Sequence, residues 1–178
     1  MRVKGFSLPV ILITFILTLS ILFSANWIYT EVAIKQPLGQ QLSEVQGVKN
    51  YTIESGSENI LLTIELGLVD NIKTSYMSLT EIADSHIMNS RGYEIRIIDN
   101  PNPQLITLWN EIQFYAYQSL VQGDFVAMKE GVERIVAANE SVNYQVYISE
   151  THLFFQVQYH ENYIYRILRR QGDSSFVL

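Results

Sequence analysis

The sequence predicts an α+β protein with one N-terminal transmembrane helix, a ferredoxin-like α-β-β-α-β module and an α-α-β-β-β module packed against it. The first observation behind this is that residues 5–30 contain no charged side chain. The second is that later segments either alternate apolar and polar residues or repeat apolar residues at helical spacing. The third is the break "NPNP" at 100–103, which separates the two halves.

The apolar segment predicts a membrane anchor with its helix over residues 6–28. A helix needs about 20 apolar residues to span the hydrocarbon core, and only hydroxyl side chains interrupt the run from Phe6 to Ala25. Arg2 and Lys4 precede the run and Glu31 follows it. The positive-inside bias then predicts a cell-membrane protein in which residues 1–30 form the cytoplasmic tip and the transmembrane helix, and the remainder is extracytoplasmic.

Two other interpretations of this segment stay open. A cleaved signal peptide has a shorter apolar region and a small-x-small exit, whereas Ala25 would have Phe23 two positions before it. A buried core helix would have a polar face at some helical spacing, and this segment has none.

Composition narrows the classes of partner. The chain of 178 residues carries 18 acidic and 12 basic side chains, a net charge of −6, and no cysteine. An acidic chain repels phosphate backbones, so no nucleic-acid partner is expected. The lack of cysteine excludes disulfides, thiolate zinc sites and a cysteine nucleophile.

The first module is predicted over 37–99, after a stalk at 31–36. A short amphipathic helix precedes two alternating strands, 49–55 and 59–67, which the turn "GSEN" joins. Asp70 is predicted to cap a helix over 71–89, and "GYEIRIID" is predicted as a third strand.

The second module is predicted over 104–178. A helix with Leu105, Leu108 and Ile112 on its buried face precedes a second helix capped by Asp124. Three alternating segments joined by short turns predict an antiparallel meander. In both modules the helices are expected to cover a small antiparallel sheet. Whether the two modules share one sheet stays open.

The order of elements in "LGQQLSEVQGVKNYTIESGSENILLTIELG" and "LTEIADSHIMNSRGYEIRIID" resembles the ring-building motif of sporulation and secretion-channel proteins. That resemblance implies self-assembly. The whole chain, through "QFYAYQSLVQGDF" and "LFFQVQYHENYIYRILRR", is similar to a group of single-pass proteins from Gram-positive bacteria. This second resemblance implies a bacterial membrane protein and no activity.

Candidates for catalysis are few. The sequence has no G-x-S-x-G and no phosphate-binding loop, and its exported part has no S-x-x-K. His152 and His160 flank one predicted strand, about 26 Å apart by strand rise, and His86 has no ligand partner at helical spacing. The acidic pairs Glu81/Asp84 and Glu130/Glu133 have the spacing of solvated helix faces. We therefore expect no enzyme activity, no cofactor and no metal.

The closing strands supply the candidate contact residues, which are Tyr159, Tyr163, Tyr165, Arg166, Arg169 and Arg170. Alternation places Tyr163 and Tyr165 on one face and Ile164 on the other, and both faces are apolar enough to be covered. The three arginines are either an edge that discourages strand pairing or a docking point for an acidic partner.

The sequence thus predicts a non-enzymatic, membrane-anchored subunit or assembly factor of a membrane complex, with a protein partner or self-association. The alternative is an exported module that binds a glycan or a peptide through tyrosines. A hydrolase with an unrecognised site is the third hypothesis.

Overall fold

A computed structural model describes residues 2–3, 6–29, 36–56, 59–87, 92–139 and 141–170. Two short strands, β1 (Arg2–Val3) and β2 (Phe6–Ser7), precede helix α1 (Leu8–Tyr29). Residues 31–35 of the predicted stalk (31–36) and the end of the predicted second module at 171–178 lie outside the described residues.

The prediction of a transmembrane helix is wrong. Within the part of the chain that the structure describes, no helix is both long enough and apolar enough to cross a membrane. The single-pass placement, with a cytoplasmic N-terminus and an extracytoplasmic domain, is corrected with it.

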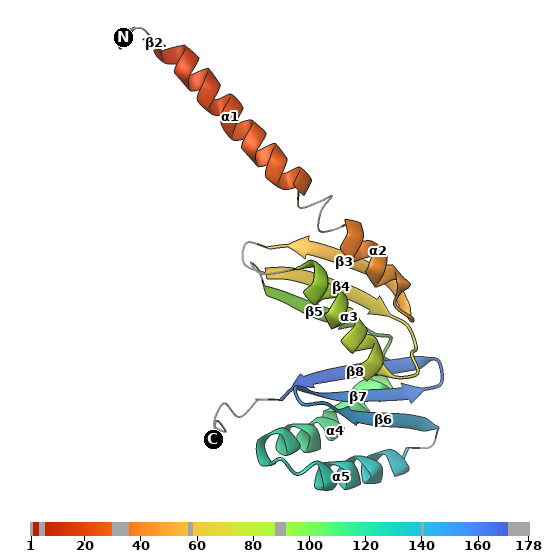
Figure 1. Cartoon of the computed structure of the whole chain (residues 1–178). Coiled ribbons are helices and arrows are strands. Elements are labelled where there is room, and N and C mark those ends of the chain that lie inside the picture. The colour runs from red at the N-terminus through yellow and green to blue at the C-terminus, as the bar shows by residue number, and fades with distance from the viewer. Residues whose placement is uncertain are drawn as a thin grey trace.

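The first module, residues 36–98, contains α2 (Gln36–Glu44), β3 (Val48–Ser55), β4 (Asn59–Leu66), α3 (Ile72–His86) and β5 (Gly92–Ile98). Its sheet has the order β3-β4-β5, and the two helices lie on one face of it (Figure 1). The core holds Leu38 and Leu42 of α2, Leu79 and Ala83 of α3, and Ile60, Leu62 and Ile64 of β4.

Two details of the first module differ from the prediction. Strands β4 and β5 are parallel, because α3 returns the chain along the sheet before β5 begins. Helix α3 begins at Ile72, and its cap is Asn71, whose side chain accepts a hydrogen bond from Thr74 N. Extended backbone at Asn71 brings its amide oxygen to this position, so the expected cap at Asp70 is wrong by one residue.

The second module, residues 103–169, contains α4 (Pro103–Gln122), α5 (Phe125–Ala137), β6 (Val142–Ile148), β7 (His152–Tyr159) and β8 (Asn162–Arg169). The antiparallel meander β6-β7-β8 is confirmed. Asn102 caps α4, and Gly123 ends it with a left-handed φ of 73°. Asp124 caps α5, as predicted.

The second sheet is buried on both faces. Leu153, Phe155, Val157 and Ile164 pack against the inner faces of α4 and α5. Phe154, Tyr163 and Tyr165 point the other way and pack against Leu66, Val69 and Ile72 of the first module. Figure 1 shows the result, in which the second sheet lies between α4 and α5 on one side and the first module on the other. The two modules therefore have separate sheets and share one interface.

Candidate functional site

Two of the six predicted contact residues, Tyr163 and Tyr165, are buried in the interface between the modules. Tyr163 and Tyr165 are 4% and 3% exposed. The Tyr165 hydroxyl accepts a hydrogen bond from Val69 N at 3.0 Å and donates one to Gly67 O at 2.9 Å. Burial raises the pKa of Tyr165 to about 12. Both side chains therefore stabilise the packing of the two modules and are not available to a ligand.

The four other predicted residues have different environments. Arg166 Nη1 is 2.8 Å from Asp99 Oδ2 and also donates to Tyr165 O. Arg170 Nη1 donates to Ser149 O, and its guanidinium lies 5.0 Å from the centre of the Phe125 ring. Tyr159 is partly buried against the α4–α5 core. Arg169 is exposed.

A groove of about 390 Å³ lies between the two modules, and we call it the inter-module groove. Its walls are residues 94–97 of β5 and residues 165–167 and Arg169 of β8. Tyr76 of α3 and His152 of β7 complete it, with their ring centroids 5.5 Å apart. Arg166 and Arg169 were singled out from the sequence. Arg96 and Glu94 were missed, since only the packing of the modules brings β5 beside β8.

The electrostatics of the inter-module groove come from its arginines. Arg96 and Glu94 form an exposed ion pair at 3.6 Å, which contributes little energy. Burial, followed by the positive charge of Arg169, lowers the pKa of His152. Burial also raises the pKa of Tyr76. His152 and Tyr76 are therefore neutral near pH 7, and three guanidinium groups face one carboxylate in the lining.

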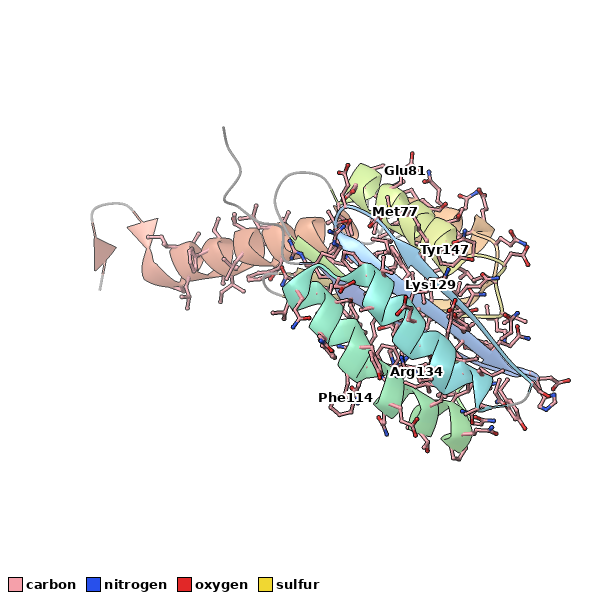
Figure 2. All side chains as sticks on the ribbon, turned by 90° about the horizontal axis from the view of Figure 1, so that it is seen from below. Met77, Glu81, Phe114, Lys129, Arg134 and Tyr147 are labelled. Carbon is pink, nitrogen blue, oxygen red and sulfur yellow. The ribbon has the colours of Figure 1, made fainter. Side chains whose placement is uncertain are left out.

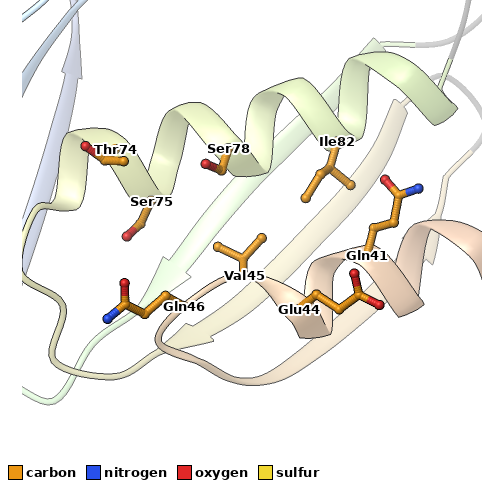
Figure 3. A pocket seen from close by; sticks show the side chains of 8 residues that line it. All are labelled: Gln41, Glu44, Val45, Gln46, Thr74, Ser75, Ser78 and Ile82. Carbon is orange, nitrogen blue, oxygen red and sulfur yellow. The ribbon is translucent and has the colours of Figure 1, made fainter.

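A second concavity of about 480 Å³ lies between α2 and α3 (Figure 3). Figure 3 shows its lining of amides, hydroxyls and two aliphatic side chains, which are Gln41, Glu44, Val45, Gln46, Thr74, Ser75, Ser78 and Ile82. Glu44 is its one charged residue. The Ser75 hydroxyl donates to Asn71 O within α3. This pocket therefore offers a shallow polar surface.

The outer face of α4 carries large apolar side chains that nothing in the described chain covers. Ile106, Phe114, Tyr117 and Val121 are 46%, 73%, 54% and 86% exposed. At 100° per residue these positions and Asn110 lie on one stripe of the helix, which we call the α4 face. Figure 2 shows Phe114 pointing outward from α4. The signal was readable in the sequence, because α4 has apolar residues on both sides and Glu111 as its one charge.

The histidines are dispersed. His86 lies at the end of α3, with Nδ1 close to Ile82 O and Ser85 Oγ. His160 lies in the turn between β7 and β8, and His152 begins β7. Over the described ranges, no group of three or more His, Asp or Glu side chains is arranged to hold a metal ion.

Comparison of the chain with protein-family models, curated proteins and solved structures found no match.

Proposed function

We propose that this chain is a non-enzymatic interaction protein, a subunit or assembly factor of a protein complex, that self-associates through the α4 face. The observation that carries the proposal is the exposure of Ile106, Phe114, Tyr117 and Val121 along one side of α4. Contiguous exposed apolar surface is unfavourable in water and marks interaction sites. A second α4 face would remove these side chains from water.

The composition of α4 favours a second copy as the occupant. A chain with a net charge of −6 repels copies of itself. The α4 face avoids this repulsion, because its polar members are uncharged and Glu111 lies off the stripe. Two copies can therefore approach through α4 without placing like charges in contact.

The spacing along α4 is also self-complementary. Consider two antiparallel α4 helices related by a twofold axis that passes between positions 113 and 114. Ile106 of one copy then opposes Val121 of the other, and Asn110 opposes Tyr117. Phe114 lies beside the axis and meets its own symmetry mate. Such a contact is isologous and closes at a dimer. The ring-building resemblance of the first module also favours self-assembly.

Binding of a glycan or a peptide through a tyrosine-rich surface has less support. Tyr163 and Tyr165 are held in the interface by hydrogen bonds and packing. Tyr159 alone of the three predicted tyrosines stays outside that interface, half-buried against the α4–α5 core. A single half-buried ring offers little of the stacking surface that a glycan needs.

The test is the molar mass of the full chain by light scattering, in a non-ionic detergent that covers the exposed side chains of α1. We expect a dimer that Phe114→Ser converts to a monomer. Met77→Ser is the matched control, because Met77 is 47% exposed on α3, away from the α4 face (Figure 2). A monomeric wild type, or a dimer that Phe114→Ser leaves unchanged, contradicts self-association through α4.

The lack of cysteine gives a second test. Phe114→Cys introduces the only thiol, and mild oxidation should link two copies, since a disulfide forms when the Cα atoms come within about 7 Å. Met77→Cys is the control and should stay unlinked. Equal cross-linking of the two variants would show random collision and count against the twofold contact.

A further inference from the structure

Strands β5 and β8 are edge strands of their own sheets, and their edges meet at one point. Tyr163 N donates to Asn100 O at 3.1 Å, and this bridge is antiparallel. Next to it, Tyr165 N donates to Asp99 Oδ2 at 2.8 Å. Past this junction the inter-module groove opens between the two strands.

The lining of the groove shows that it is bordered by backbone as well as side chains. Successive residues of a strand point to opposite faces of its sheet. Four consecutive residues of β5, 94–97, and three of β8, 165–167, line the same space. A space that touches both faces of a strand runs along its edge, where the hydrogen-bonding groups are unpaired.

The edge of β8 continues into the groove, and the hydrogen bonds of Tyr163 and Tyr165 show which of its backbone N–H groups point outward. The N–H groups of Tyr163 and Tyr165 point away from β7, toward Asn100 and Asp99. Because backbone groups alternate along a strand, the next outward N–H groups belong to Ile167 and Arg169. Both residues lie in the groove lining.

Asp99 shows which side-chain chemistry this edge accepts. Its carboxylate receives hydrogen bonds from Tyr165 N and Arg166 Nη1, both at 2.8 Å. Further along, where no described residue pairs with it, the edge repeats this combination, with outward N–H groups beside the exposed guanidinium of Arg169. Arg96 faces it from β5. Charge complementarity therefore selects an acidic occupant on a chain that is otherwise acidic.

We propose that the inter-module groove binds an extended acidic peptide segment of a partner protein. The segment adds as a strand along β8, accepts hydrogen bonds from Ile167 N and Arg169 N, and places carboxylates against Arg96 and Arg169. Main-chain pairing supplies affinity in this mode of recognition, and side-chain pairs supply specificity. The site is separate from the α4 face, so it does not rest on self-association.

The test is fluorescence anisotropy of the full chain with a labelled short peptide of alternating glutamate and valine. We expect saturable binding that the double variant Arg96→Gln/Arg169→Gln weakens at least about tenfold, which is 1.4 kcal/mol. Arg134→Gln is the matched control, an exposed arginine of α5 (Figure 2). A peptide of alternating lysine and valine should not bind. Equal weakening by Arg134→Gln overturns the proposal.

Strand pairing is tested separately from charge. N-methylation of alternate amides of the peptide keeps its glutamates but blocks one of its two hydrogen-bonding edges. When the methylated edge is the one that pairs with β8, binding should weaken at least about tenfold. Unchanged binding with either edge blocked means attraction by charge alone, as free glutamate or phosphate would show, and overturns strand addition. Amide exchange gives an independent readout, in which the peptide should protect Ile167 and Arg169. The peptide titration is repeated on the Phe114→Ser variant, which we expect to be monomeric, so that peptide binding is measured separately from dimerisation.

Discussion

Gln156 Nε2 donates a hydrogen bond of 2.7 Å to the backbone oxygen of Val69. Its Oε1 accepts a second bond, at 3.0 Å, from Ile72 N. One buried side chain of β7 thus satisfies both an acceptor and a donor in the turn that leads into α3. This pair of bonds fixes the position of the first module on the second sheet.

Replacing Gln156 with Leu should lower the free energy of unfolding by about 2–4 kcal/mol. The reason is that two buried backbone groups lose their partners, at about 1–3 kcal/mol each, partly offset by the apolar replacement. Urea unfolding monitored by circular dichroism measures the change. Gln104→Leu, at an exposed position in the first turn of α4, is the control and should change the free energy by less than about 0.5 kcal/mol. Equal effects of the two variants would contradict this role of Gln156.

Asp99→Ala should cost about 2–3 kcal/mol of unfolding free energy, because Arg166 and Tyr165 N both lose their acceptor. The contrast is Glu94→Ala, which removes an ion pair at 3.6 Å whose side chains are 59% and 65% exposed. Exposed pairs contribute about 0–1 kcal/mol. If urea unfolding shows Glu94→Ala to be as costly as Asp99→Ala, the junction of β5 and β8 does not depend on Asp99.

The stabilising contribution of Tyr165 should depend on pH. Its pKa is raised to about 12 by burial in the folded chain, above about 10 in the unfolded chain. A raised pKa stabilises the fold fully below the unfolded value, and this contribution is lost as pH rises from about 10 to about 12. The difference in unfolding free energy between wild type and Tyr165→Phe should therefore shrink over that window. Tyr117→Phe, at an exposed position, serves as the control. A difference that stays constant would show that Tyr165 is not desolvated.

Gly131→Ala should destabilise α5 by about 1–3 kcal/mol, although alanine is the better helix former. A Cβ atom at Gly131 would run into the Tyr115 ring, at Cδ1 and Cε1, where α4 and α5 pack together. Truncating the ring with Tyr115→Ala should remove this penalty, so that Gly131→Ala becomes neutral or stabilising in that background. A double-mutant cycle by thermal unfolding checks this. If the two substitutions show no coupling energy, the contact between Gly131 and the Tyr115 ring does not limit the packing of α4 and α5.

Much of the fold followed from local patterns. The spacing of Leu105, Leu108 and Ile112 correctly predicted the buried face of α4, and Asp124 correctly predicted the start of α5. These features depend on residues close in sequence, where helical spacing and capping act. The parallel pairing of β4 with β5 was missed, because strand order depends on where α3 crosses the sheet.

The candidate sites divide in the same way. The exposed apolar residues of α4 lie on one helix, so helical spacing alone could have predicted the α4 face. From the sequence we predicted only the buried face of this helix. The inter-module groove could not be read from the sequence. Arg96 and Arg169 both line it although they are far apart in the sequence, and the packing of the two modules that brings them together depends on Gln156, Tyr165 and Asp99.

By itself the sequence determined the α+β class, most helices and strands, and the antiparallel meander, because these follow from hydrophobic periodicity, caps and turns. Tertiary structure alone decided what covers each face of the second sheet, α4 and α5 on one side and the first module on the other. It turned Tyr163 and Tyr165 inward, since burying their rings against Leu66 and Val69 removes apolar surface from water. It also left the α4 face and the edges of β5 and β8 uncovered by the part of the chain that the structure describes.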